Sequence, residues 1–275
     1  AALVEKFQSA DLTVKGRGYI LDVLAQAGDA PAQAALRAAL ETPAAQARPR
    51  DFSLLVQRFT FVVAPEPESA EFLERQLDQA RGARDVAAAQ GAAVALGSTV
   101  RRLAELGRED EARRYDARLR DDLAYAKDAR LQRGLLAALG NAARLDDVDA
   151  IRAHAGSGEP LVRDQVASSL RHLDSAGSRA TLLQLAQDAH STVAVSAFSS
   201  LRTQTMDAAE WAALAAVVTA GKTPVAADSA LVALVREKRA IAGASGDAIL
   251  STLLARNGGG DNDLAPIILQ MLSPP

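Results

Sequence analysis

One helical pattern occurs three times between residues 131 and 201: Leu131-x3-Leu135-x3-Leu139, Val162-x3-Val166-x3-Leu170 and Val193-x3-Ala197-x3-Leu201. The copies start about 31 residues apart, and a looser fourth copy follows with Val225, Ser229-Ala230 and Leu234. Apolar residues four positions apart share one face of a helix, and a fixed period of about 20 to 50 residues is typical of stacked repeats. The pattern therefore predicts a solenoid of helical hairpins.

A second set of helices fits the same period. The sequences Val148-x2-Ile151, Leu182-x2-Leu185 and Trp211-x2-Leu214 precede the second, third and fourth copies, and we interpret them as the first helices of hairpins. The third begins at Asp207-x2-Glu210, which has the spacing of a capping box. The serine pairs Ser168-Ser169 and Ser199-Ser200 recur with the repeat, and we expect them on the exposed side of the second helices.

The first half of the chain is less regular. The stripe Tyr19-Ile20-x2-Val23-Leu24-x2-Ala27 predicts an amphipathic helix that ends at Gly28, and Pro31 suits the first turn of the next one. A long helix is predicted from Val86 to Leu106, ended by Gly107. We therefore expect a single α-solenoid over residues 1–275, with irregular longer hairpins over 1–127 and regular HEAT-like hairpins over 128–275. The segment 258–263 is predicted to be a turn before a final helix.

Composition agrees with an all-α class. Hydrophobic residues make up 49% of the chain but aromatic residues only 4%, and alanine, leucine and valine supply the difference. Alanine and leucine favour helices, whereas strands favour aromatic and β-branched residues. The predicted fold is a right-handed α-α superhelix of antiparallel hairpins in two layers.

Charge and cysteine content limit the partners. The net charge is −3, with 31 basic and 34 acidic residues mixed along the sequence. A nucleic-acid-binding surface needs a basic stripe, so we expect no nucleic acid partner. No apolar run is long enough for a transmembrane segment. The absence of cysteine excludes disulfides and thiolate metal sites.

No catalytic, cofactor-binding or metal-binding residues are predicted. The three histidines, His154, His172 and His190, are 18 residues apart, so a 31-residue period places them in different kinds of element. The sequence Ala220-Gly221-Lys222-Thr223 resembles the end of a phosphate-binding loop, but it follows a predicted helix instead of a strand. We interpret it as a turn in which Thr223 caps the next helix. The chain is accordingly predicted not to be an enzyme and to need no cofactor.

Residues 109–125 form the most highly charged segment, with ten acidic or basic side chains. We interpret the segment as a helix whose solvated face carries ion pairs four residues apart. A charged recognition surface is the alternative. The acidic pairs Asp121-Asp122 and Asp146-Asp147 are expected at helix N-termini or in solvent.

The second half resembles HEAT repeats, as in Pro160-Leu161-Val162-Arg163-x3-Ala167-x2-Leu170. With the first half included, residues 15–200 resemble the superhelical region of the vitellogenin and lipid transfer protein N-terminal family. The segments that carry this resemblance are residues 19–31, Leu96-Gly97-Ser98-x-Val100-Arg101-Arg102-Leu103 and Leu135-Leu136-Ala137-Ala138-Leu139-Gly140-Asn141-Ala142. The chain departs from that family at Asp29, where threonine is favoured, and in lacking cysteines and the β-rich parts of the lipid cavity.

These observations predict a non-catalytic helical scaffold that binds another protein or another domain of its parent chain. The resemblance implies an alternative, a module that braces the lipid cavity of a vitellogenin-like transport protein. An α/α enzyme is a third possibility. Neither end of the chain has the polar face of a capping repeat, and the sequence starts at Ala1. We therefore expect a piece of a longer protein, or a protein that has lost a leader. The resemblance and the missing leader together favour an extracytoplasmic location.

Overall fold

The structure, a computed structural model, describes residues 2–9, 11–47, 49–257 and 264–273. Every regular element in these ranges is a helix, and none of the described residues lies in a strand. The chain divides into two compact units, residues 1–150 and 151–275. The turn predicted at 258–263 lies outside the described residues.

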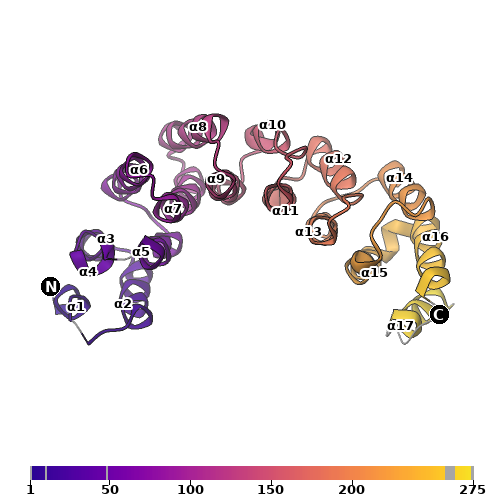
Figure 1. Cartoon of the computed structure of the whole chain (residues 1–275), viewed down its shortest axis with the longest axis horizontal. Helices are drawn as coiled ribbons and strands as arrows, with labels where there is room; N and C mark the ends of the chain where they lie inside the picture. Colours follow the sequence, from indigo (N-terminus) through magenta and orange to yellow (C-terminus); the bar gives the residue numbers. More distant parts are fainter. Residues whose placement is uncertain (1, 10, 48, 258–263, 274–275) are drawn as a thin grey trace. The chain divides into compact units, whose positions relative to one another are not determined.

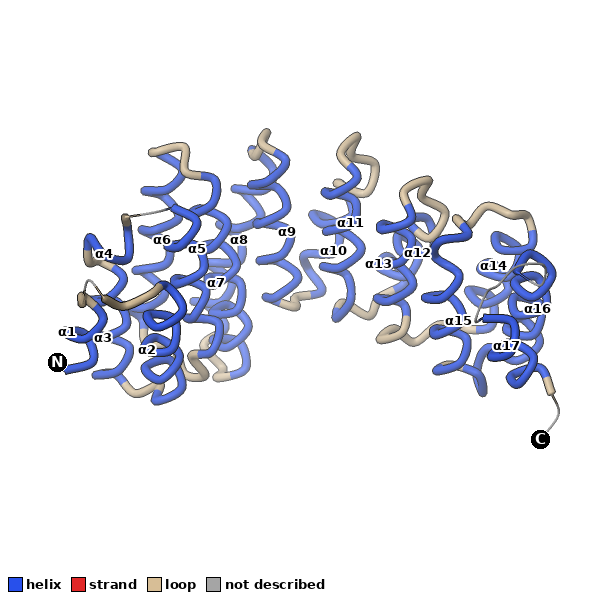
Figure 2. Tube along the Cα trace, turned by 60° about the horizontal axis from the view of Figure 1, so that its bottom comes forward, coloured by secondary structure: helices blue, strands red, loops and turns tan. Residues whose placement is uncertain are grey.

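The first unit consists of consecutive helices joined by short turns (Figures 1 and 2). Its elements are α1 (Ala2–Phe7), α2 (Val14–Ala27), α3 (Ala30–Leu40), α4 (Pro43–Gln46), α5 (Pro49–Val56), the 3-10 helix η1 (Gln57–Phe61), α6 (Pro67–Gly82), α7 (Val86–Glu105), α8 (Glu109–Tyr125), α9 (Ala129–Ala142) and η2 (Leu145–Asp147). The short helix α10 (Val148–Arg152) lies at the division between the units.

Helix α7 is the centre of the first unit, because it packs against α5, α6, α8 and α9. It begins where Asp85 accepts a hydrogen bond from the backbone N–H of Ala88 (3.1 Å), and Gly107, with φ of +77°, lies in the turn that follows it. Seven of its buried residues are alanine or glycine, on faces directed to different neighbours. Small side chains let four helices approach one axis, which explains the low aromatic content.

The closest approach in this unit is between α7 and α9. A methyl group added at Gly97 would overlap the backbone carbonyl of Ala138, and one added at Gly134 would meet Gln90 Cγ at 2.6 Å. Gly91 is similarly close to the backbone of Ser53 on α5. Glycine is required here because of backbone contact between helices and not because of a positive φ.

The second unit has the regular hairpins that the period predicts (Figure 2). The second helices α11, α13, α15 and α17 pack against one another in succession, and α14 packs against α16. Two layers result. The elements are α11 (Pro160–Ser169), η3 (Leu170–His172), α12 (Ala176–Leu185), α13 (Ser191–Leu201), α14 (Ala208–Thr219), η4 (Val225–Ala227), α15 (Asp228–Glu237), α16 (Arg239–Asn257) and α17 (Leu264–Leu272).

The repeated apolar pattern forms the core of these layers. In the second helices Val162, Val166 and Leu170 are completely buried, as are their counterparts Val193, Ala197 and Leu201. The looser fourth copy departs from the pattern, since Val225 is 61% exposed. The predicted fold class, an all-α HEAT-like solenoid, is confirmed. That all 275 residues form one continuous solenoid stays a prediction.

Three local predictions need correction. In α2 the buried stripe is Leu21, Leu24 and Ala25, whereas Tyr19 and Val23 are more than half exposed. A stripe of i, i+3 and i+4 spacing can be drawn on two adjacent faces of this helix, and only the tertiary contacts choose between them.

One serine of each repeated pair is also buried, because Ser169 and Ser200 lie on the packed side of α11 and α13, whereas Ser168 and Ser199 are partly exposed. Thr223 does not cap a helix: its hydroxyl oxygen lies 3.3 Å from both terminal nitrogens of Arg256, and α15 begins only at Asp228.

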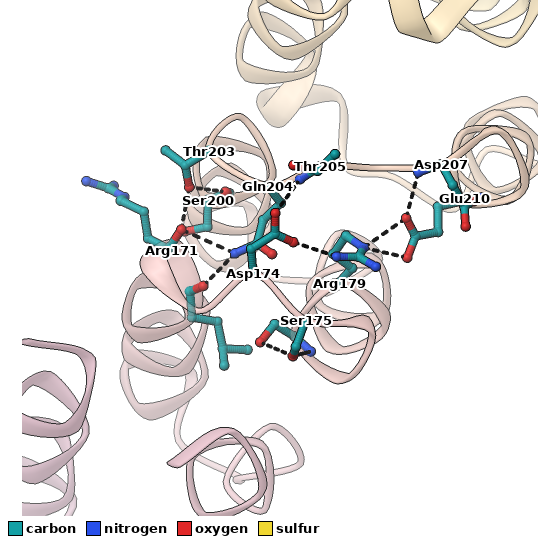
Figure 3. A network of polar contacts seen from close by, with 12 residues as sticks. Arg171, Asp174, Ser175, Arg179, Ser200, Thr203, Gln204, Thr205, Asp207 and Glu210 are labelled. Atoms are coloured by element: carbon teal, nitrogen blue, oxygen red, sulfur yellow. Dashed lines mark hydrogen bonds and ion pairs between the residues drawn. The ribbon is translucent and has the colours of Figure 1, made fainter. Parts of the chain in front are cut away.

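Polar contacts in the second unit follow the same period (Figure 3). Arg179 on α12 donates from Nε to both carboxylate oxygens of Glu210 on α14, at 2.7 and 2.9 Å, and the two residues are 31 positions apart. The backbone N–H of Thr205 donates to Asp174, again 31 positions away. Glu210 is also part of the capping box predicted at Asp207. Equivalent positions of adjacent repeats therefore bond directly.

Gln204 extends this network into the core. It is buried and donates its amide to the carbonyl oxygens of Leu170 (2.8 Å) and Arg171 (3.2 Å). These carbonyls are at the end of α11, where a helix leaves its last acceptors without partners in its own backbone. A side chain of the following repeat thus satisfies the end of the preceding second helix.

Gly97→Ala is expected to lower the free energy of unfolding by about 2–3 kcal/mol, because the added methyl forces α7 and α9 apart. Gly82→Ala is the matched control, since nothing lies within 4 Å of a Cβ at that position, and it is expected to raise stability by less than about 1 kcal/mol. Urea unfolding followed by circular dichroism measures both. Equal effects of the two substitutions would contradict the close contact.

Arg179→Ala is expected to cost about 1–3 kcal/mol, because it leaves two carboxylates without their shared donor. Arg171→Ala removes an exposed arginine from the same region and should change stability by no more than about 0.5 kcal/mol. If both variants unfold at the same urea concentration, the inter-repeat bonds contribute nothing.

Candidate binding groove

A groove of about 550 Å³ lies in the first unit, where the turn between α6 and α7 meets the turn between α8 and α9. Its volume falls within the range of about 300–1,000 Å³ that is usual for ligand sites. Two smaller hollows lie in the same unit, one of about 180 Å³ that shares Ala80 and Asp85 with the groove and one of about 340 Å³ at residues 12–14, 17, 47, 51 and 55. The larger groove is the best candidate for a binding surface in the described part of this unit.

The floor of the groove is apolar and comes from three helices. Ala80 belongs to α6, Val86 and Ala89 to α7, and Leu131 to α9. Ala80 and Ala89 are buried, while Val86 and Leu131 are partly exposed. The hollow exists because Ala80 and Ala89 have small side chains, and the larger side chains of Val86 and Leu131 lie at its border.

The rim is polar and comes from the two turns. Arg84 has a left-handed backbone, with φ of +56°, and directly precedes Asp85, the N-cap of α7. Tyr125 ends α8, and Lys127 directly precedes Asp128, the N-cap of α9. The same local motif, a cation followed by a capping aspartate, therefore occurs on both turns.

The charges of the rim are not all engaged. Arg81, also on the rim, is paired with Asp122. Asp128 accepts hydrogen bonds from the backbone N–H groups of Arg130 and Leu131, at 2.9 and 3.0 Å. Arg84 and Lys127 are exposed, and neither forms an ion pair with any described residue. The side chain of Tyr125 is 79% exposed.

No motif of the sequence indicates this groove. Arg84 and Lys127 are 43 positions apart and outside the 31-residue repeat, so no motif connects them. The only available signal was that each is followed by a capping aspartate at the start of a helix. The prediction that the chain has no binding, catalytic or metal residues is not tested by the fold and stays a prediction.

The charged segment has the predicted solvated face, with Asp110, Arg113 and Asp121 exposed, and in addition an interface with neighbouring helices. Helix α8 has the expected pairs four residues apart, such as Arg113–Glu109 at 2.9 Å. It also forms ion pairs with α6, among them Arg114–Glu74 at 2.8 Å. Asp122, expected in solvent, is buried. The prediction was wrong here because arginines of a neighbouring helix make burial of these carboxylates possible.

A buried pair of carboxyl groups lies on the other side of α8. Asp116 and Asp147 have no exposed surface, and each influences the pKa of the other. Arg120 Nη1 lies 3.1 Å from Asp116 Oδ2 and 3.0 Å from Asp147 Oδ1. Arg144 Nε lies 3.3 Å from Asp116 Oδ2. The acidic pair 146–147, expected at a helix N-terminus or in solvent, therefore contributes one exposed and one buried carboxyl.

Burial raises the pKa of Asp147 to about 8, and the negative charge of Asp116 acts in the same direction. The pKa of Asp116 is also raised, mainly by burial. With a pKa of about 8, the pair keeps one proton at neutral pH. Because neither residue reaches the surface, we assign the pair to the packing of α8 against the turn after α9.

The other sequence motifs do not come together. His154 follows α10, His172 is in η3 and His190 is the N-cap of α13. Burial lowers the pKa of His154. Within the described ranges, no three His, Cys, Asp or Glu side chains are grouped so as to hold a metal ion. Gly221 has a φ of +69° in the turn after α14, which agrees with the interpretation of residues 220–223 as a turn.

Comparisons with known proteins gave matches among solved structures alone. No family model and no curated protein sequence matches it. Among solved structures, it is similar to the complex of CpcE and CpcF of phycocyanin lyase from Nostoc sp., with 16% identity, 98% of this chain and 92% of that chain covered, and a TM-score of 0.48. Human deoxyhypusine hydroxylase in complex with glycerol matches at 17% identity, over 92% and 83% of the two chains, with a TM-score of 0.30.

This chain is a HEAT-like helical repeat protein. Nothing in the comparisons supports the resemblance to the vitellogenin family or a role in lipid transport. The prediction that the chain is not an enzyme is contradicted, since both matched structures are named as enzymes. Among the described helices, none has the length and apolar character needed to cross a bilayer.

Asp147→Asn is expected to flatten the dependence of stability on pH between about pH 5 and 8. The unfolded carboxyl titrates near 3.8 and the folded one at about 8, so in this window the unfolded chain has lost a proton that the folded chain keeps. Wild-type stability therefore falls as the pH rises, by about 1–3 kcal/mol more than that of the variant. Carboxylates with a lowered pKa, such as Glu109 and Asp188, act in the opposite direction, but below this window.

Urea unfolding at several pH values between 5 and 8 measures this difference. Asp146→Asn, at the adjacent carboxyl with 78% of its side chain exposed, is the control and should keep the wild-type slope. A variant at Asp147 with an unchanged slope would show that the pair shares no proton.

Proposed function

We propose that this chain is a helical scaffold that binds another protein, or another domain of its parent chain, through the groove between the α6–α7 and α8–α9 turns. The observation that carries the proposal is the exposed ring of Tyr125 beside an apolar hollow. Tyrosine and arginine dominate the energetics of protein interfaces, because each combines apolar area with a polar end.

The fold supports the same function. Stacked hairpins bury their apolar faces against one another and leave the turns and outer faces to present side chains. The groove is built from two such turns and rests on α7, the helix with the most neighbours in its unit. A binding surface on this support is preorganised, so little ordering of the backbone accompanies binding.

Tyr125→Ala tests the proposal. Peptides are selected from a phage-displayed random library on the full chain, and their dissociation constants are measured on wild type, Tyr125→Ala and Tyr19→Ala. Tyr19 is also an exposed tyrosine on a helix of the first unit, but it is not among the residues of the groove. We expect Tyr125→Ala to weaken the selected peptides at least about 5-fold and Tyr19→Ala to leave them unchanged.

Circular dichroism of both variants checks that the fold is retained. Selection of peptides that bind wild type and Tyr125→Ala equally well would place binding elsewhere on the chain and overturn the groove as the contact surface. Failure to select any peptide on wild type would likewise count against a peptide-binding groove.

A further inference from the structure

We infer that the groove selects a protein segment in which an apolar side chain is flanked by acidic residues. This inference rests on the proposed function and adds the chemistry of the partner. It follows from three features of the groove: two cations without partners, a floor without charge, and carboxylates that are already engaged.

The two available cations lie on separate turns that border the same apolar floor. Arg84 is between α6 and α7, and Lys127 is between α8 and α9. A protein segment that inserts a side chain between the two turns therefore lies close to both Arg84 and Lys127. The third cation, Arg81, is compensated by Asp122, which also lies 3.2 Å from Arg118 Nε. The unpaired positive charge of the rim therefore comes from Arg84 and Lys127.

The acidic residues of the groove do not cancel this charge for a ligand. Asp85 and Asp128 each accept backbone N–H groups at the start of a helix, where the helix dipole already compensates a negative charge. The charges that remain for a ligand are therefore those of Arg84 and Lys127. Carboxylates of a partner are the complementary groups.

A free phosphate or similar small anion fits less well. Such anions bind at helix N-termini through backbone N–H groups, but here the N-caps Asp85 and Asp128 occupy these donors on both α7 and α9. The groove instead has two exposed cationic side chains around a hollow that can bury an apolar group. Acidic side chains on either side of a leucine or phenylalanine match both parts.

Three peptide pools test the inference on the full chain. Each pool has four central positions randomised among leucine, isoleucine, phenylalanine and tryptophan, with two residues on each side fixed as glutamate, glutamine or lysine. Pools are captured on immobilised wild-type protein and quantified by mass spectrometry against Tyr125→Ala. We expect the glutamate pool to be enriched about 3-fold or more over the glutamine pool at about 50 mM NaCl, and the lysine pool to be depleted.

Two controls assign the effect to the rim. Arg84→Asn with Lys127→Gln should abolish the preference for glutamate, since asparagine tolerates the left-handed backbone at position 84. Arg171→Gln with Lys222→Gln removes two exposed cations from the second unit and should leave the preference intact. At about 500 mM NaCl the preference should fall below about 2-fold because of screening.

The outcomes separate the two proposals. If the glutamine pool is enriched as strongly as the glutamate pool, and enrichment depends on Tyr125, the groove binds protein segments but the acidic preference is overturned. If no pool is enriched over Tyr125→Ala, the proposed function fails together with the inference. A glutamate preference that survives removal of Arg84 and Lys127 would also overturn the inference.

Discussion

A helical hairpin with one apolar face cannot bury that face by itself, and the structure of this chain depends on that constraint. Each unit resolves it by packing second helices against second helices, as in α5, α7 and α9 of the first unit and α11, α13 and α15 of the second. Where the helices are closest, at Gly97 against the backbone of Ala138, the contact leaves no room for a methyl group. Burial of apolar surface stabilises the stack by roughly 25 cal/mol per Å², and small residues let more of that surface meet.

The polar contacts have the same spacing as the apolar ones. Arg179 and Glu210 bond across 31 positions, and so do Asp174 and Thr205. The buried carboxyl pair Asp116–Asp147 has this spacing too. A repeat that superimposes on its neighbour brings equivalent positions together, and these three pairs are examples. The helix packing thereby determines which polar partners are possible.

This explains how much of the molecule was predictable from the sequence. The period, the class and the buried positions such as Val166 and Ala197 follow from local spacing, which a sequence displays directly. The burial of Asp122 and Asp147 does not, because it depends on arginines of other helices and on a proton shared between carboxyl groups. The groove was equally hidden, since Arg84 and Lys127 are brought together only by the packing of two hairpins whose lengths break the period.

Helix α7 links the groove to the core. It supplies two residues of the groove floor, and it forms the closest helix contacts of the core. Native-state hydrogen exchange tests the central claim, that contact between successive second helices holds each unit together. The amides of α7 and α9 should exchange only through unfolding of the whole first unit, while those of α1 and α4 exchange by local opening. Exchange of α7 at the rate of α1 would contradict the account.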